Sequence, residues 1–225
     1  MAIFSKIMKR WGEDYAAHHD GLDPFSVTWN QSHAWDQAHT NESKLFAREP
    51  DMERFRQAFE LAEASEFESA LDIWRDLAAN GSAGSMVEIG ACYETGCVVA
   101  QDTIEAEQWY YRAFLGGSQS AMLRYAAAAA SRRDFKLCEE ILEVGVRQDW
   151  TPAIFWQAWY RHRQSENSVT YQTILPALQK AARRGHPAAR MILSTFMVQG
   201  KFGILRIPLG FLLAARTSWE EALAD

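Results

Sequence analysis

The sequence predicts an all-α protein built as an α-solenoid, in which antiparallel helix pairs follow one another in a right-handed superhelix. Three observations support this prediction. Glycines recur at fixed intervals, small and apolar residues follow them at helical spacing, and 48% of the 225 residues are hydrophobic against 23% charged. A chain of this length and composition buries a full core without disulfides, so the repeat can form one continuous solenoid.

The N-terminal segment precedes the repeat. Residues 1–11 carry apolar residues at helical spacing and lack the unbroken apolar stretch of a secretory signal, so we expect a short amphipathic helix and no signal. Residues 12–44 are polar and rich in turn-forming residues, with Trp29 and Trp35 embedded in them. From Thr28 to Ser43 we expect a loop. Residues 1–44 are then a helix and loop extension that caps the first helices of the solenoid.

The first helix pair is expected over residues 50–80, and the second pair follows Gly81. Small or apolar residues at 85, 86, 89 and 93 predict a helix over residues 82–94, and Gly96 is placed to end it in a left-handed conformation. Asp102 is placed to cap the next helix, with Glu105 as the second half of a capping box. The two glycines at 116 and 117 end that helix.

Later copies keep the frame of this unit. Glycine recurs at 81, 117 and 185, and Asp149 takes its place in a degenerate copy, so the spacings are 36, 32 and 36 residues. Gly200 follows the last of these glycines at the distance at which Gly96 follows the first. Equivalent residues of the first two copies include Ala70 with Ala106 and Trp74 with Tyr110. We expect the repeat to extend to the C-terminal region.

The second copy carries a repeat signature. Its positions are Gly81, Ser85, Ile89, Gly90, Tyr93, Gly96, Val99, Asp102, Ala106, Trp109, Tyr110 and Ala113. In order and spacing they resemble the Sel-one-like repeat, a relative of the tetratricopeptide repeat. Ser85 and Val98 depart from the pattern, since they stand where the family has alanine and glycine. The resemblance covers about residues 45–215 and implies an adaptor that holds other proteins, often in bacterial signalling and envelope regulation.

The solenoid is expected over residues 45–216, followed by a tail over residues 217–225. Its last segment, Phe202 to Arg216, is apolar nearly all round. Three interpretations stay open for this segment: a buried plug, a contact with a second copy or another protein, or a contact with a membrane surface. The segment is shorter than the roughly 20 apolar residues of a spanning helix, so we expect no transmembrane helix.

The net charge of −6 conceals a basic C-terminal quarter. Residues 167–218 contain seven lysines and arginines and no acidic residue, while the rest of the chain is acidic. Such an end either docks an acidic protein, anionic lipid or nucleic acid, or is the solvated rim of the last helices. Because no nucleic-acid-binding motif accompanies the charge, we expect no nucleic-acid partner.

No residue pattern predicts catalysis. The histidines at 18, 19, 33 and 39 lack the spacing of metal ligands, and Cys92 and Cys97 lack the two-residue gap of redox or zinc motifs. Cys138 is expected to be a small core residue. The sequence holds no phosphate loop, dinucleotide fingerprint or nucleophile elbow. We therefore expect no enzyme activity, no cofactor and no metal site.

Partner-binding residues are expected on the first helix of each pair, which lines the concave side of such a stack. Counted from the repeat glycine, the candidates are Glu88, Arg124, Trp156, Trp159, Tyr160, Ile192 and Phe196. Five aromatic residues fall within residues 150–160, and aromatic residues anchor many protein interfaces. Whether this aromatic cluster belongs to the core or to an interface stays open.

The leading functional hypothesis is a non-catalytic bacterial adaptor in the cytoplasm, which binds a protein or peptide in the solenoid groove. The chain has three cysteines, which are too few and odd in number for a disulfide framework. This cysteine count favours a reducing compartment. Two alternatives stay open: an immunity-type inhibitor of an effector enzyme, and a peripheral membrane regulator that uses both ends of the chain. A homodimer formed through Phe202 to Arg216 also stays open, as one of the three interpretations of that segment.

Overall fold

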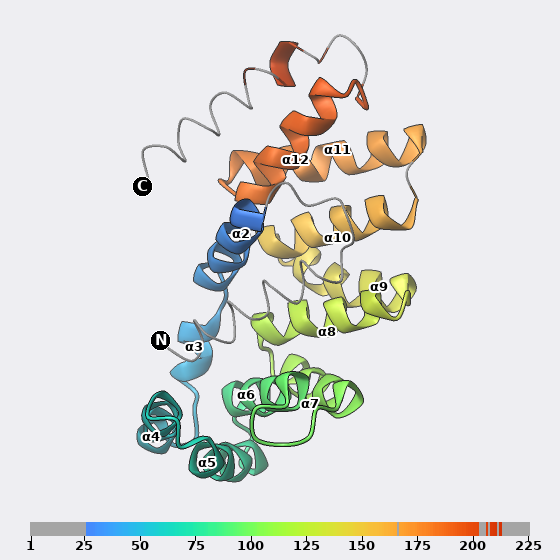
Figure 1. Ribbon diagram of the computed structural model, residues 1–225. Coiled ribbons are helices and arrows are strands. Elements are labelled where there is room, and N and C mark those ends of the chain that lie inside the picture. The colour runs from blue at the N-terminus through green and yellow to red at the C-terminus, as the bar shows by residue number, and fades with distance from the viewer. Residues whose placement is uncertain (1–25, 166, 203–205, 207, 211, 213–225) are drawn as a thin grey trace. The chain divides into compact units, whose positions relative to one another are not determined.

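The computed structural model describes residues 26–165, 167–202, 206, 208–210 and 212, and the regular elements within them are helices (Figure 1). They are α2 (Ser26–Ala38), α3 (Glu42–Phe46), α4 (Met52–Glu63), α5 (Phe67–Ala79), α6 (Ala83–Thr95), α7 (Thr103–Leu115), α8 (Gln119–Ser131), α9 (Phe135–Arg147), α10 (Thr151–Gln164), α11 (Ser168–Arg183) and α12 (Pro187–Val198). The helix expected over residues 1–11, the tail after residue 216 and most of the apolar segment that begins at Phe202 lie outside the described residues.

The chain divides into two compact units. The first contains the described residues of Thr40–Ala128, and the second contains those of Phe25–His39 and Ala129–Asp225. Helix α2 therefore belongs to the second unit, although it precedes the first unit in the sequence.

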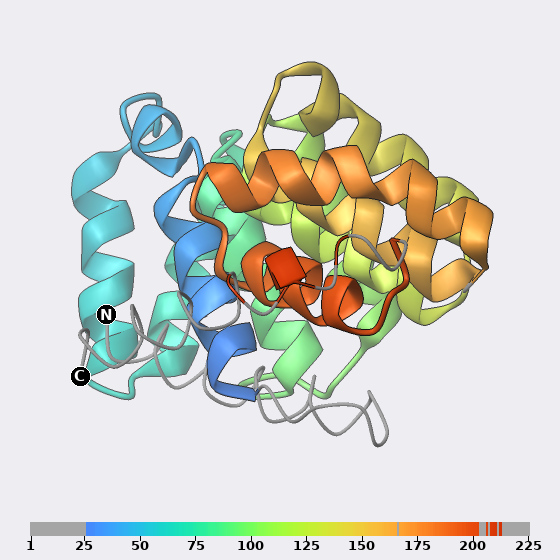
Figure 2. The same cartoon turned by 90° about the horizontal axis from the view of Figure 1, so that it is seen from above.

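Consecutive helices pack against each other within both units. In the first unit α4 contacts α5, α5 contacts α6 and α6 contacts α7, and in the second unit the helices from α9 to α12 do the same. Figures 1 and 2 show α11 and α12 as neighbours. Helices that are joined by short turns and packed in chain order are helical hairpins, so the predicted all-α solenoid fold is confirmed.

The turn that ends each second helix has the same geometry in four copies. Gly81, Gly117 and Gly185 adopt left-handed φ angles of 92°, 90° and 96°, and Asp149 adopts 59°. In each copy this residue donates its N–H to the carbonyl three residues before it, and the next residue donates to the carbonyl five residues before itself, with N···O distances of 2.9 to 3.1 Å. This bond pair is the Schellman motif. The degenerate copy has therefore lost the glycine and kept the turn.

Ionic contacts accompany the left-handed conformation of Asp149. Its carboxylate accepts hydrogen bonds from Lys180 Nζ at 2.5 Å and from Arg184 Nη2 at 2.6 Å, and its backbone carbonyl accepts one from Arg184 Nη1 at 2.8 Å. The hydrogen bonds from Arg184 and Lys180 lower the pKa of the Asp149 carboxyl from 3.8 to about 2. The turn is thereby joined to the end of α11, one hairpin further along the chain.

A glycine sets the closest approach of α6 and α7. A Cβ atom added to Gly90 would lie 2.6 Å from Cε1 of Tyr110, closer than non-bonded carbon atoms approach. Tyr110 is fully buried, as is Trp74 at the equivalent position of the previous pair. Small residues on the first helix and large aromatic residues on the second thus pack the hairpins of the first unit.

One sequence expectation for the N-terminal extension is wrong. The loop expected from Thr28 to Ser43 is helical over most of its length, in α2 and in part of α3. Helix α2 contacts α12 within the second unit. The reason is that Ser32 and Asp36 lie one helical turn apart, and the partners of both side chains are on α10 and α12.

The predicted capping box at α7 forms only in part. Asp102 accepts hydrogen bonds from the N–H groups of Ile104 and Glu105, as expected. Its own N–H donates to the carbonyl of Tyr93 at 2.9 Å, so the backbone of α6 holds the group that the Glu105 side chain was expected to bind. The predicted left-handed end of α6 at Gly96 is confirmed, with a φ of 67°.

Substitution of Gly90 tests the close approach of α6 and α7. We expect Gly90→Ala to lower the free energy of unfolding by about 1–3 kcal/mol, because the added methyl group overlaps the Tyr110 ring. Urea denaturation measures the change, and Ser69→Ala at an exposed position of α5 is the control. Equal stabilities of the two variants would show that the helices separate without cost.

Substitution of Asp149 tests the ionic contacts of the degenerate turn. Because the pKa of Asp149 is lower in the folded chain than its ordinary 3.8, its contribution to stability is complete above about pH 4 and is lost as the pH falls toward 2. Asp149→Asn removes the charge and tolerates the left-handed conformation. In urea denaturation at several pH values, we expect the variant to lose less stability than the parent chain between pH 4 and pH 2. The same loss in both proteins would contradict the assignment.

Candidate functional site

Helix α2 is held on the other helices of the second unit by a small set of residues. Residues at the start of α10, within α10 and at the start of α12 donate hydrogen bonds to α2 and to His39, which follows it. We call this set, Trp150, Trp156, His186 and Ala188, the α2 site. Trp156, one of the predicted partner-binding residues, belongs to this set.

The carboxylate of Asp36 lies at the centre of the α2 site. Only 1% of the residue is exposed to solvent. Trp156 donates its Nε1–H to Oδ2 at 2.7 Å, and Nε2 of His186 lies 3.1 Å from Oδ1. Each carboxylate oxygen therefore has one donor.

The position of His186 fixes its tautomer. His186 is the N-cap of α12, and its Nδ1 accepts the N–H of Ala189 at 3.2 Å. A nitrogen that accepts a hydrogen bond carries no proton, so the proton of the neutral ring is on Nε2, which donates to Asp36. The carboxylate is thus held by two uncharged donors beside the positive end of a helix.

Two further hydrogen bonds hold α2 and its C-terminal end. Ser32 Oγ accepts the N–H of Ala188 at 2.8 Å, and the carbonyl of His39 accepts the Nε1–H of Trp150 at 2.7 Å. Ring contacts add to them. His33 stacks on Trp156 with ring centroids 5.5 Å apart, and Phe155 stacks on His186 within the α2 site at 4.0 Å. In each of the four hydrogen bonds the donor belongs to the α2 site and the acceptor is Ser32, Asp36 or His39.

The structure places three of the predicted partner-binding residues in the interior. Trp156 is 4% exposed and Arg124 and Ile192 are each 5% exposed, so none of them presents an open surface. For Trp156 this favours the core interpretation of the aromatic cluster, because its indole N–H is used within the chain. The other four candidates, Glu88, Trp159, Tyr160 and Phe196, are half-buried.

Two of these half-buried residues contact the interior from its edge. Trp159 lies 5.4 Å from the buried ring of His162, and Phe196 contacts His162 and Tyr171 at centroid distances of 4.8 and 5.3 Å. Buried Phe202 lies beside the same cluster, 6.0 Å from Phe196. Phe202 therefore begins the apolar C-terminal segment as part of the core.

Arg124 belongs to a buried ionic cluster of the first unit. Its Nη1 donates to Oε2 of Glu94 at 3.1 Å and to the Tyr110 hydroxyl at 3.2 Å, and Tyr110 donates to the same carboxylate oxygen at 2.6 Å. Burial disfavours the cation, but Tyr110 and the negative charges of Glu94 and Glu88 outweigh it and raise the pKa of Arg124. The predicted residues Glu88 and Arg124 are thus electrostatic neighbours. Their arrangement stabilises the hairpin of α6 and α7.

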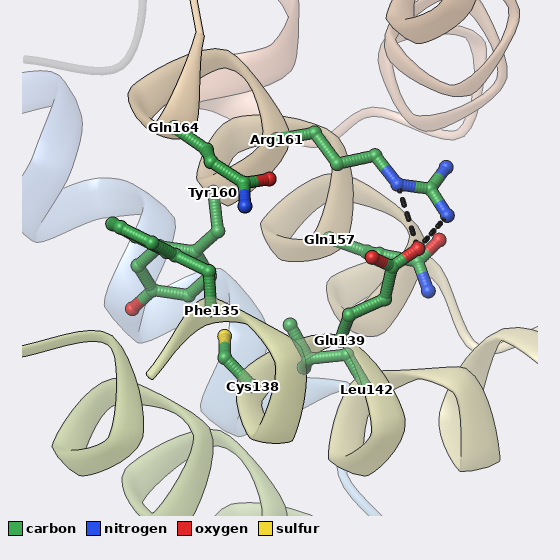
Figure 3. Close-up of a pocket in the computed structure, with 8 residues that line it drawn as sticks. All are labelled: Phe135, Cys138, Glu139, Leu142, Gln157, Tyr160, Arg161 and Gln164. Atoms are coloured by element: carbon green, nitrogen blue, oxygen red, sulfur yellow. Dashed lines mark hydrogen bonds and ion pairs between the residues drawn. The ribbon is translucent and has the colours of Figure 1, made fainter. Parts of the chain in front are cut away.

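A small pocket lies between α9 and α10, and Tyr160 lines it (Figure 3). Glu139 and Arg161 form an ion pair at its edge, with Arg161 Nε 3.1 Å from Oε1. Its space of about 10 Å³ has room for roughly one water molecule. The remaining lining residues are Phe135, Cys138, Leu142, Gln157 and Gln164. A pocket of this size is too small for a substrate.

The remaining candidates for chemistry among the described residues are metal ligands and buried thiols. In the described ranges no three His, Cys, Asp or Glu side chains are placed to hold a metal ion, and His18 and His19 lie outside those ranges. Burial raises the pKa of Cys138 to about 12, and a hydrogen bond with Cys97 together with burial raises that of Cys92. Both buried thiols are therefore protonated at neutral pH and are poor nucleophiles.

None of the helices that the structure describes has the length and apolar character needed to cross a bilayer.

Comparison with known proteins adds the fold family. The chain matches no family model and no curated protein. Among solved structures it is similar to a Sel1 repeat protein from Oxalobacter formigenes, with a TM-score of 0.53 and 20% identity over 65% of this chain and 62% of that chain. It is also similar to c5321, a protective antigen of uropathogenic Escherichia coli strains displaying an SLR fold, with a TM-score of 0.58 and 17% identity over 89% of this chain and 46% of that chain.

The chain has the Sel1-like repeat fold. It spans 62% and 46% of the lengths of these two structures, and at these identities the likeness concerns the fold alone. The resemblance drawn from the signature at residues 81–113 is confirmed at that level.

Sequence reasoning did not identify His186 and Asp36, which form the central contact between α2 and the α2 site. Within the Sel1-like repeat frame, the residue after each turn glycine is the N-cap of the next helix, and it is serine at 82 and 118. In the last copy His186 takes this place. A histidine that replaces a capping serine was the available signal for its position. Nothing in the sequence marked Asp36 as its partner, because 150 residues separate the two.

Substitution of Asp36 tests the assignment of the α2 site. Asp36→Asn turns an amide N–H₂ toward a donor, so one hydrogen bond is lost and two donors face each other. We expect the free energy of unfolding to fall by about 1–3 kcal/mol. Urea denaturation measures it, with Asp72→Asn, an exposed carboxylate of α5, as the control. Equal effects of the two substitutions would remove Asp36 from the stabilising contacts.

Proposed function

We propose that the chain is a non-catalytic interaction scaffold that binds a partner protein or peptide against the first helices of its repeat pairs. The observation that carries the proposal is α2 itself, a helix held on α10 and α12 by side-chain and backbone donors. A face that holds one helix by defined hydrogen bonds has the chemistry to hold another. The Sel1-like repeat fold supports this function, since stacked helix pairs offer extended surfaces for binding. An adaptor role in the bacterial cytoplasm is the setting that we propose for it.

The half-buried candidates define where such a partner contacts the scaffold. Glu88 on α6 and Tyr160 on α10 are on first helices and are partly open to solvent. Ile104 on α7 is 71% exposed but lies on a second helix, so it is the natural comparison position. Large exposed apolar residues are ordinary when they occur singly.

Photo-crosslinking tests the proposal. A photoreactive phenylalanine analogue replaces Glu88, Tyr160 or Ile104, one at a time, in the full chain expressed in its native host. We expect one defined protein to be captured from positions 88 or 160 and not from position 104. Capture from position 104 alone would place the binding surface on the second helices. Absence of a specific product at all three positions would contradict a scaffold function.

A further inference from the structure

The chain already holds a helix on its candidate binding face, and that helix shows what the face recognises. Building on the function proposed above, we propose that α2 is a displaceable occupant of the α2 site. The partner is a helix that presents a carboxylate, with a small hydroxyl residue one turn before it, in the places of Asp36 and Ser32.

The spacing of the two side chains defines the recognised pattern. Ser32 and Asp36 are four residues apart, so they lie on one face of α2, one turn from each other. Both are fully buried, at 0% and 1% exposure. Ser32 accepts from the N–H of Ala188, while Asp36 accepts from Trp156 and His186. A helix without oxygen acceptors at these two places would leave buried donors unsatisfied, and its binding would be weaker for that reason.

The electrostatics of the site favour an anion. Ala188 and the N-cap His186 belong to the first turn of α12, where the unpaired N–H groups give the helix its positive end. Since Nδ1 of His186 is occupied by the N–H of Ala189, its Nε2 can serve only as a donor in this arrangement. The site therefore accepts a carboxylate and disfavours a neutral amide or a cation at the same place.

The binding of α2 is of the kind that a competitor can replace. In the described part of the chain, Asp36 has His186 as its ionisable partner and lies within ion-pair distance of no lysine or arginine. Burying a carboxylate among neutral donors costs desolvation energy that offsets much of the hydrogen-bond gain. An isolated helix of 13 residues is also marginally stable in water. The advantage of α2 is its covalent attachment, which gives it an effective concentration on the order of millimolar.

Displacement has a signature that a purely structural contact lacks. Weakening α2 within the chain raises the fraction of molecules whose site is open, so the apparent affinity for an added helix rises. Weakening the site itself lowers that affinity. Both kinds of substitution destabilise the folded chain, but they move binding in opposite directions.

A peptide of residues 26–39 is the probe, since its complementarity to the site is known. Fluorescence anisotropy follows the labelled peptide as full-length chain is added. We expect Asp36→Asn in the chain to bind the peptide at least about tenfold more tightly than the parent chain, and Ser32→Ala to give a smaller gain. Adding Trp156→Phe to Asp36→Asn should remove the gain. A peptide that itself carries Asp36→Asn should bind about tenfold more weakly, which corresponds to the loss of about 1.4 kcal/mol.

Controls keep each result interpretable. Asp72→Asn in the chain is the matched charge removal, and circular dichroism verifies that every variant is folded. Ser32→Ala changes no charge, so it tests the inference if Asp36→Asn fails to fold. Equal peptide affinities for the parent chain, Ser32→Ala and Asp36→Asn would overturn the proposal.

Two further outcomes distinguish the displacement of α2 from an exchange of α2 between two copies and from a scaffold function without displacement. If α2 instead exchanges between two copies of the chain, sedimentation will show a dimer of the parent chain that the peptide dissociates, and the occupant proposed here is wrong. If a partner is photo-crosslinked at positions 88 or 160 but the affinity for the peptide is the same with and without Asp36→Asn in the chain, the scaffold function stands and the displacement of α2 does not. Failure of both experiments would remove both proposals.

Discussion

The constraint on which the fold depends is the left-handed turn at the end of each second helix. A helix hairpin stacks on the next one only if the chain leaves each helix in the same direction, and one residue with positive φ sets that direction. Four such turns share one hydrogen-bond pattern in this chain. Within this common frame, buried Trp74 and Tyr110 take equivalent places on the second helices of successive pairs.

The described helices are held together in two different ways. Within the repeat, hairpins are joined by apolar and aromatic packing, with one buried ionic cluster around Arg124. Helix α2 is joined to α10 and α12 of its own unit through oriented polar contacts at Ser32 and Asp36. Packing tolerates substitution by residues of similar volume, whereas a donor pointed at an oxygen tolerates little. The first kind of contact suits a permanent core, and the second suits recognition.

Local patterns in the sequence predict the repeat, but they do not predict contacts between residues that are far apart in the sequence. The helix over residues 82–94, its end at Gly96 and the cap at Asp102 each depend on residues a few positions apart, so their pattern is visible in one sequence. The role of Trp156 was left open because its partner, Asp36, is 120 residues away. Arg124 lies at a position expected to face a partner, but Glu94 and Tyr110 draw it into the interior. Counting from the repeat glycine finds a helix face, yet it does not tell whether another part of the chain covers it.

The turn at Asp149 has a consequence for how such chains diverge. A comparison by residue identity expects glycine at this place and misses the copy that begins at Asp149, although its backbone has the conformation of the other turns. Where ionic contacts hold the left-handed residue, the turn no longer requires glycine, and another residue can replace it. Each such replacement removes one position of the repeat signature and leaves the architecture unchanged. Solenoids of this kind can thus pass beyond the reach of sequence comparison while every hairpin keeps its place.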